Sequence, residues 1–489
     1  MRILYIDIDT LRPDHLPIYG YPRPTAPTIS AIAREGVWFT ACYTSDSPCV
    51  PARAALVSGR MGIHNGVVTH WGPGANFRWP LTETTWDQDY SQDAPLFPRY
   101  LRQHGYRTAT VSSFGDKHQA PWFGFAWSES HNFTLKRGNE DAEEVAREAR
   151  AWLAQHGREE NWLLHVHFWD PHKNYTMPPH YVTQMARYPA PPWPDARTLD
   201  RHQDPAIGPG SAADFWAWGD RRVSPVPTMP DAITTVDYFR QLIDSYDGAI
   251  RYADEAVAQI LGDLRGLGIE DETAIIIASD HGEAFGEHGL YAQHADAGRA
   301  VERVPLIVRW PGAAREVASD ALVYLQDIVP TIVDLLGLPM PPGWDFQSVA
   351  SIIRSGNSSA AGRRQLVWGH GLYVCQRALF DPPWLYLRTY HPGLFDWPEE
   401  SLYAIDRDPH ETENRVAEEP AVASRMRGDL ARWLEEASQG NERDPMDEVI
   451  ASGGPYRYVK PGPWLNHLRA MGWEAAARRV EQRLRSGTP

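Results

Sequence analysis

The sequence predicts an α/β fold: a doubly wound mixed sheet sandwiched by helices, with a smaller antiparallel subdomain at the C-terminal end. Three observations predict it. A chain of 489 residues is too long for one small core. Short β-branched runs alternate with helical patterns over roughly the first 340 residues. From Gln365 the pattern changes to short strand-like pieces, which divides the chain into 1–364 and 365–489.

Buried strands are the clearest predicted elements. Each is a short apolar or β-branched run of strand length. In a doubly wound sheet, ligands bind beyond the carboxyl ends of the strands, so polar residues directly after a strand are candidates for a site. The predicted strands are Ile3 to Ile8, Thr108 to Val111, Trp162 to Phe168, Ala274 to Ala278 and Pro305 to Val308.

Helical patterns fill the intervals between these strands. In the larger domain they cover Thr28 to Glu35, Asp141 to His156 and Val236 to Leu267. In the subdomain, strand-like pieces are followed by a helical stretch from Ala421 to Ala437 and an arginine-rich helix near Trp473 to Leu484. The alternation supports a sheet with helices on both faces.

Residues 178–230 depart from this alternation. The segment is crowded with Pro, Gly, Asp and Trp and shows no sustained period. Long irregular insertions in a compact domain are usually functional or mobile. We therefore expect a flap that faces a substrate.

Charge and cysteine content limit the classes of function. The formal net charge of -16 argues against a nucleic-acid binder, which needs a basic surface. It does not argue against a small anionic substrate, because local cations and a metal set the field inside a cleft. The three cysteines, Cys42, Cys49 and Cys375, provide no disulfide framework, which favours a reducing compartment.

The sequence shows no targeting or membrane segment. The chain begins MRILYIDID, directly in an apolar alternating run, without the pattern of a secretion signal. No uninterrupted apolar stretch reaches membrane-spanning length. We therefore expect a cytoplasmic protein with no nucleic-acid or membrane partner, and a homo-oligomer is left open.

The strongest single motif is SDSPCVPARAALVSGR, which contains Cys49, Pro51 and Arg53 in the order Cys-x-Pro-x-Arg, followed by Ser58-Gly59-Arg60. A lone cysteine is most often a buried structural residue. The extended motif, however, resembles the signature of type I sulfatases, members of the alkaline phosphatase superfamily, in which this cysteine is oxidised to formylglycine. The resemblance implies an alkaline-phosphatase-like catalytic domain over 1–364 and a formylglycine-generating enzyme as a partner during maturation.

Further segments resemble the same family in the family's order. They include the opening strand with its metal aspartate, the second strand, a segment with a substrate-contacting histidine, the second metal-ligand turn, the strand after it, and the small C-terminal subdomain. These segments are 8–39, GYRTATV, WDPHKNY, IIIASDHGEAFGEHG, RVPLIVRWPG and SLYAIDRDPHETEN.

The resemblance implies a metal site formed by Asp9, Cys49, Asp280 and His281. Asp9 and Asp280 both follow apolar strands, so both should reach the same edge of the sheet. A hard divalent cation prefers oxygen ligands, and we expect calcium first, with magnesium or manganese as alternatives. For a single Asp after a strand, a helix cap or turn would be the simpler interpretation. Asp7 lies on the same strand face as Asp9 and is expected to be a supporting or salt-bridge residue.

The family's reaction follows from an aldehyde at position 49. Once hydrated, it presents two hydroxyls; one, activated by the metal, attacks sulfur in line and displaces the alcohol, and loss of the other hydroxyl's proton expels sulfate. Arg53 lies one helical turn after Cys49 and could hold the diol or its metal-bound oxygen.

Histidines and a lysine are the candidates for contacts with the substrate. His172 is the first candidate for the proton donor to the leaving oxygen. Lys117 and His118, in SSFGDKHQ, take roughly the place of the family's Lys-Trp-His segment, although a surface Lys-His pair is the commoner explanation. His294 stands nine residues before Arg303, where sulfatases usually have a lysine. We expect it to face the substrate with partial charge, unless the register shifts and it is a polar loop residue.

Three functions remain open. The first is hydrolysis of a carbohydrate or small-molecule sulfate ester. The second is hydrolysis of phosphonate monoesters or phosphodiesters at the same site, which Thr10 and His281 keep open because many sulfatases carry Asp and Asn there. The third is a binding protein without catalysis, which would bind its ligand without turnover after maturation.

Overall fold

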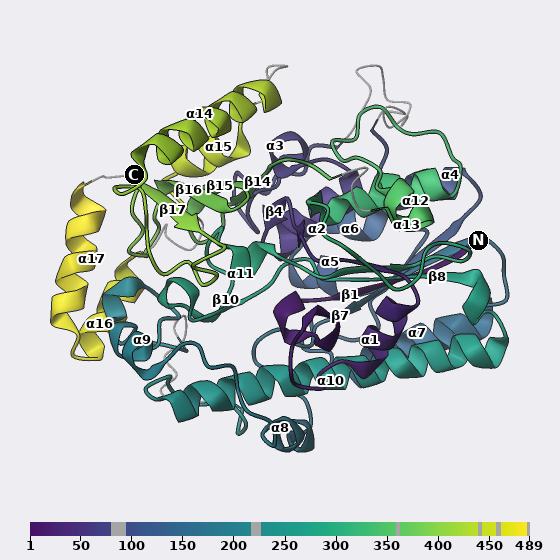
Figure 1. Cartoon of the computed structure of the whole chain (residues 1–489), viewed down its shortest axis with the longest axis horizontal. Helices are drawn as coiled ribbons and strands as arrows, with labels where there is room; N and C mark the ends of the chain where they lie inside the picture. Colours follow the sequence, from purple (N-terminus) through teal and green to yellow (C-terminus); the bar gives the residue numbers. More distant parts are fainter. Residues whose placement is uncertain (80–93, 217–225, 358–361, 439–442, 456–460, 487–489) are drawn as a thin grey trace.

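The computed structural model describes residues 1–79, 94–216, 226–357, 362–438, 443–455 and 461–486. Its larger part is built on an eight-stranded sheet in the order β12-β2-β11-β8-β1-β7-β5-β6 (Figure 1). The strands are β1 (Arg2–Ile8), β2 (Val37–Phe39), β5 (Arg107–Val111), β6 (Glu129–His131), β7 (Trp162–Phe168), β8 (Thr273–Ala278), β11 (Leu306–Arg309) and β12 (Val317–Ser319).

Strand directions make this a mixed sheet. The central strand β1 runs parallel to both of its neighbours, β7 and β8, and β5 and β6 continue the parallel part. In contrast, β11 pairs antiparallel with β8 and β2. The predicted mixed sheet is confirmed, and the five strands expected from the sequence are all present within a residue or two of their predicted ends.

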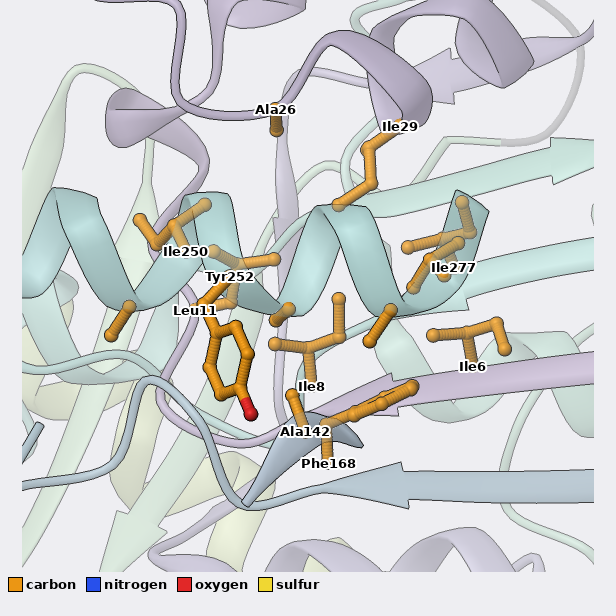
Figure 2. Packing of buried hydrophobic residues seen from close by; sticks show 14 of the residues in the cluster. Ile6, Ile8, Leu11, Ala26, Ile29, Ala142, Phe168, Ile250, Tyr252 and Ile277 are labelled. Atoms are coloured by element: carbon orange, nitrogen blue, oxygen red, sulfur yellow. The ribbon is translucent and has the colours of Figure 1, made fainter. Parts of the chain in front are cut away.

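Side chains alternate between the two faces of β1, and each face has its own core. Ile6 and Ile8 pack with Ile250 of helix α10 (Val236–Leu267) and Ile29 of α1 (Pro27–Arg34) (Figure 2). Helix α7 (Ala142–His156) completes this layer. Ile3 and Tyr5 belong to the core on the opposite face, formed with α2 (Cys49–Ser58), α4 (Phe97–Gln103), α6 (Pro121–Phe125), α12 (Ile328–Leu335) and α13 (Ala350–Ser355).

A second sheet forms the C-terminal part, in the order β17-β16-β15-β14-β4. Four of its strands pair antiparallel, as predicted. The fifth, β4 (Asp46–Ser47), comes from the larger part of the chain and pairs parallel with β14, so the expected antiparallel sheet is in fact mixed. The other strands are β14 (Leu366–His370), β15 (Cys375–Asp381), β16 (Trp384–His391) and β17 (Glu400–Ala404).

Helices cover and extend this second sheet. Helix α14 (Pro420–Ala437) packs on it through Ala423, Met426 and Leu430. Helices α16 (Pro461–Ala470) and α17 (Glu474–Ser486) form a hairpin against Leu394; Figure 1 shows it in yellow beside α9. Helix α15 (Pro445–Ala451) packs against β15.

Part of the predicted irregular insertion is helical. Within 178–230 the chain forms α8 (Pro179–Met185), which packs against α10, α9 (Ala196–Arg201) and the 3-10 turn η3 (Pro205–Ile207). The absence of a sustained period is explained by the brevity of these helices, since each has fewer than two turns of sequence to show one. Residues 217–225 of the expected flap lie outside the described residues.

None of the helices in the described ranges is long and apolar enough to cross a membrane.

Short elements complete the described chain. The short elements are η1 (Pro13–His15), η2 (Pro17–Tyr19), β3 (Cys42–Tyr43), α3 (Gly62–Asn65), α5 (Phe114–Lys117), η4 (Glu270–Glu272), β9 (Ala284–Phe285), η5 (Glu287–Gly289), β10 (Tyr291–Gln293), α11 (Arg299–Glu302), β13 (Val323–Tyr324) and η6 (Leu325–Asp327).

Candidate functional site

Two acidic residues lie at the carboxyl end of β1. Because side chains alternate along a strand, Asp7 and Asp9 lie on the face of Tyr5, toward α2. The Asp9 amide continues the ladder by donating to Phe168 O at 3.0 Å. The next residue, Thr10, has φ of +58°. A β-branched residue in this region is strained, and such strain tends to occur at functional sites.

Asp280 and His281 directly follow β8, the neighbour of β1 in the sheet. The Ser279 hydroxyl, between the strand and these residues, donates to His281 O at 2.7 Å and accepts from Leu11 N at 2.9 Å. The turns after β1 and β8 are therefore tied together. Parallel strands end at the same edge, which brings Asp9 and Asp280 to one place as predicted.

Cys49 is the first residue of α2, and Arg53 lies one turn further along the same helix. The helix ends at Gly59, which has φ of +67° and lies against the ring of Trp344, where a Cβ atom would clash. Glycine is therefore required for both reasons. The second half of the sequence motif shapes the helix end, and the first half carries the reactive groups.

The structure brings the four predicted metal ligands together. One ligand atom each from Asp9, Cys49, Asp280 and His281 lie within 4.8 Å of one another, and all four residues are buried. Cys49 Sγ is 3.1 Å from His281 Nε2. A second group, made of Cys49, His281 and His294, meets the same distance limit. We call Asp9, Cys49, Asp280 and His281 the donor cluster.

Arg53 joins the carboxylates of this cluster. Its Nε donates to Asp7 Oδ2 at 2.9 Å, and its Nη1 donates to Oδ2 of Asp9 and of Asp280 at 3.2 and 2.5 Å. Asp7 is thus the salt-bridge partner that the strand pattern predicted. The described contacts of Arg53 are to carboxylates and to the ring of Phe114 at 4.9 Å; its contact with a diol stays a prediction.

The two carboxylates titrate differently because they share one guanidinium. Burial opposes ionisation of both, but Arg53 and a hydrogen bond from His167 hold the pKa of Asp9 well below its usual range. Burial, together with the negative charge of Asp9, raises the pKa of Asp280 well above its usual range despite Arg53. Without a cation, the site therefore favours one ionised and one protonated carboxyl group.

The remaining carboxylate oxygens fit a divalent cation. Oδ1 of Asp9 and Oδ1 of Asp280 are buried and have no hydrogen-bond partner among the described residues. Buried oxygens without partners are costly. A divalent ion would satisfy both oxygens and favour the ionised form of Asp280.

Two histidines of β7 support these aspartates, and the sequence analysis missed them. Nε2 of His165 is 3.3 Å from Asp7 Oδ2, and Nε2 of His167 is 3.3 Å from Asp9 Oδ2. On the other side of each ring, Nδ1 lies 2.9 Å from a hydroxyl: that of Thr110 in β5 for His165, and that of Ser112, directly after β5, for His167. The signal was the alternation in WLLHVHF, which places both histidines on the face shared with Asp7 and Asp9.

Lys117 and His118 lie beside the donor cluster, at the end of α5. The Lys117 ammonium lies 4.2 Å from the centre of the Trp169 ring. The ring centre of His118 lies 4.8 Å from the ring centres of both Phe114 and His70. Within the described part of the chain, neither ring nitrogen of His118 makes a hydrogen bond. Burial and the charge of Lys117 hold the pKa of His118 well below its usual range, so its ring is neutral.

His172 and His294 close the opposite side. Their ring centres are 5.7 Å apart, and His294 is 4.6 Å from the ring of His281. Nδ1 of His294 lies 3.6 Å from Oε1 of Glu283. Burial lowers the pKa of His294, and burial with the charge of Lys117 lowers that of His172 to about 4. His294 thus lies beside His281, where the sequence analysis expected it. Because burial lowers its pKa, its ring is uncharged near neutral pH.

A cavity of about 360 Å³ lies apart from these residues. It is lined by residues of the β9–β10 region and the C-terminal part, among them His288, Trp397 and Glu411. None of the predicted site residues lines it. Its size does not make it the functional site, because the buried groups of possible metal ligands lie around Cys49.

Comparisons with known proteins agree with this arrangement. The sequence model of the family described as "Sulfatase" matches residues 2–338. A protein of Formosa agariphila named "Sulfatase" is 24% identical over 373 residues, 69% of each chain. A structure solved with its substrate D-glucosamine-2-N,6-O-disulfate has a TM-score of 0.72 at 19% identity and covers 91% of this chain and 99% of that one. The phosphonate monoester hydrolase of Agrobacterium radiobacter has a TM-score of 0.69 at 19% identity, with 89% and 96% covered. At this identity, both structures show the fold alone.

Proposed function

Because this chain belongs to the sulfatase family of the alkaline phosphatase superfamily, we propose that it hydrolyses a sulfate ester with a formylglycine made from Cys49 and one divalent metal ion. The donor cluster is the observation that carries this proposal. Four residues from three separate elements converge within 4.8 Å, and two of their carboxylate oxygens lack partners among the described residues. A divalent ion would satisfy these oxygens.

In the proposed reaction each donor has a distinct role. Asp9, Asp280 and His281 hold the ion together with the oxygen that replaces the Cys49 sulfur. The ion and the hydrated aldehyde supply positive charge and an oxygen nucleophile for in-line attack at sulfur. Arg53 orients both aspartates, because its guanidinium bonds to Oδ2 of each and leaves Oδ1 available to the ion. We expect calcium, with magnesium or manganese as alternatives.

Residues around the donor cluster would bind the ester and protonate its leaving oxygen. We assign the proton transfer to His172, with His118 as the second candidate. Both rings are neutral without substrate, so the donor must first take up a proton, which the negative charge of a bound sulfate ester favours. Lys117 would supply a positive charge for the sulfate oxygens, although burial lowers the pKa of its ammonium group. His294 contacts the substrate through a neutral ring, in contrast to the lysine that the family usually has at this place.

A sulfated carbohydrate or another small sulfate ester is the substrate class we propose. The solved structure with D-glucosamine-2-N,6-O-disulfate supports the carbohydrate choice. The formylglycine-generating enzyme is the partner needed for maturation. The domain boundary near 364, the flap, the cytoplasmic location and a homo-oligomer stay predictions of the sequence.

A second candidate is hydrolysis of phosphonate monoesters or phosphodiesters. Two residues favour it: Thr10 and His281 occupy places where many sulfatases carry Asp and Asn. In-line transfer to a metal-activated oxygen suits both reactions.

Mass spectrometry of the tryptic peptide from Glu35 to Arg53, taken from the native host, tests the maturation step. An aldehyde or its hydrate at position 49 supports the proposal. An intact thiol in fully active protein would sink the formylglycine mechanism. The matured protein is then assayed on aryl sulfate, phosphate diester and phosphonate monoester substrates; a higher kcat/KM on sulfate supports the sulfatase, and a higher value on phosphorus substrates supports the alternative.

A further inference from the structure

The chain as translated carries sulfur, not oxygen, at the centre of its donor cluster. Cys49 Sγ lies 3.1 Å from Nε2 of His281. One ring nitrogen of His294 also lies within 4.8 Å of both. All three side chains are buried. This group differs in chemistry from the carboxylates beside it, because its donors are one thiol and two imidazoles.

Both imidazoles are oriented as metal ligands. Nδ1 of His281 lies 2.8 Å from Gly282 O, which requires an N–H there and leaves a lone pair on Nε2, directed at Cys49 Sγ. Nδ1 of His294 lies 3.6 Å from Oε1 of Glu283, close enough for an electrostatic contact but too far for a hydrogen bond. The other oxygen of that carboxylate accepts from the hydroxyl of Tyr175. Backbone carbonyls and carboxylates behind the ring are the usual partners of metal-binding histidines.

The distances suit a tetrahedral ion. With Zn–S near 2.3 Å and Zn–N near 2.0 Å, the edges of such a site are about 3.5 Å long. The observed separations range from 3.1 Å to no more than 4.8 Å, so small side-chain rotations would close the site. The candidate for the fourth ligand is Oδ1 of Asp9, which is 3.8 Å from His281 Nε2 and unpartnered among the described residues. It belongs to the donor cluster and not to the group with His294, so it would have to move to complete the site.

Arg53 contacts the carboxylates of the donor cluster but neither imidazole. Its Nη1 donates hydrogen bonds to Oδ2 of both Asp9 and Asp280. The hydrogen bonds and ion pairs described for Arg53 do not involve His281 or His294. Thiolate and imidazole donors select zinc and similar ions, whereas carboxylates select calcium and magnesium. The sulfur form and the oxygen form of residue 49 therefore prefer different metals.

We propose that the unmodified chain binds a zinc-class divalent ion through Cys49 Sγ, His281, His294 and Asp9 Oδ1. The ion replaces the thiol proton, which leaves to solvent, while the sulfur keeps its electron pair as a thiolate ligand. The loss of this site when Cys49 is converted to an aldehyde rests on the proposed function. Conversion then removes the sulfur ligand and exchanges a soft-ion site for a hard-ion site.

Cobalt(II) titration tests the proposal on full-length protein whose intact Cys49 thiol has been verified by mass. We expect a near-ultraviolet thiolate-to-cobalt charge-transfer band and strong visible bands of a tetrahedral ion, both abolished by one equivalent of zinc and unaffected by excess calcium or magnesium. Loss of the charge-transfer band in Cys49→Ser, and a metal affinity at least about 100-fold lower in His294→Gln, would support the ligand set, since even outer-shell losses cost up to that much.

Two further variants make the result decisive. Cys375→Ala removes another buried thiol and should leave the band unchanged. Asp280→Asn weakens the carboxylate set and should also retain the band. Thermal unfolding of each metal-free variant verifies the fold. The proposal is overturned if thiol-intact protein gives no charge-transfer band, or if the band survives in Cys49→Ser. Neither readout uses turnover, so failure of the sulfatase proposal would show separately, in the matured protein.

Discussion

The donor cluster and the rim of the site, which we define as Lys117, His118, His172 and His294, are built in different ways. The donors follow two central strands or begin a long buried helix, and their carboxylates are tied together by one guanidinium. The rim residues lie at the end of a four-residue helix or in loops. Their histidines are neutral and two of them have free ring nitrogens among the described atoms.

The donor cluster is therefore suited to binding an ion, and the rim is suited to binding a substrate. The donor cluster is electrostatically interlocked, so removal of one charge affects the stability of the rest. Rim groups have fewer fixed partners, which leaves them available to a substrate and lets their charge respond to pH. The following predictions would break or sharpen this comparison, and they run from the largest expected effect to the smallest.

Cys49→Ala should have the largest effect. Without the side chain that becomes the nucleophile, we expect kcat/KM on an aryl sulfate to fall by at least about 10⁴-fold, as for other nucleophile deletions. Stability should change little, because the side chain is small. Cys375→Ala, a buried thiol in β15, is the control and should retain activity. An active Cys49→Ala protein would remove Cys49 from the mechanism.

Arg53→Ala should destabilise the metal-free protein by about 3 to 5 kcal/mol, because it leaves buried carboxylates without their cation. Urea unfolding with and without a divalent ion measures this. Added ion should recover part of the loss, since it neutralises Asp9 and Asp280.

Arg23→Ala is the matched control for that experiment. Arg23 is fully buried and pairs with Asp244 and Asp247, away from the donor cluster. We expect a comparable loss that no divalent ion recovers. Equal recovery in both variants would show that the ion acts elsewhere than at the donor cluster.

The donor cluster was predictable from the sequence because its residues follow strong local patterns. Asp9 and Asp280 come after apolar runs, and parallel strands end at one edge, so their proximity follows from fold class alone. Cys49 and Arg53 were found by their motif. The rim was predicted with less detail, since short helices and loops have no period that fixes where a side chain lies.

Two features were missed because their roles become clear only when distant segments pair. His165 and His167 lie in a run whose apolar neighbours indicate only a buried strand; their role appears once β7 is placed beside β1. Strand β4 has two residues, too few for any pattern, yet it pairs with β14 and joins the Cys49 helix to the C-terminal sheet. Such a strand exists only through its tertiary partner.

His167→Ala should weaken metal binding by about 10- to 100-fold, because it removes the ring that bonds to Asp9 and is itself held by Ser112. Calorimetric titration of the metal into matured protein measures the change. His165→Ala is the matched control: its ring bonds to Asp7, which is not a predicted ligand, so the affinity should change less. A larger effect at His165 would mean that Asp7, rather than Asp9, holds the ion.

We expect the smallest effect from His172→Gln, which changes how the free energy of unfolding depends on pH. Burial and the charge of Lys117 lower its pKa to about 4 from an ordinary 6.5. Below pH 6.5 this histidine binds a proton in the unfolded chain but not in the folded protein. The contribution of the neutral His172 ring to the free energy of unfolding is therefore complete above pH 6.5 and is lost as the pH falls toward 4. In metal-free buffer, His172→Gln should reduce the slope of unfolding free energy in this window by up to about 1.4 kcal/mol per pH unit.

His64 provides a control of opposite sign. Burial lowers its pKa, but the bond to Asp345 outweighs this and raises it overall. Its contribution is therefore present below pH 6.5 and is lost as pH rises through the folded-state pKa. His64→Gln should cost stability in acid and less near neutrality, whereas His172→Gln should do the reverse. If both variants shift the profile in the same direction, the neutral ring assigned to His172 is wrong, and the rim would carry charge in the absence of substrate.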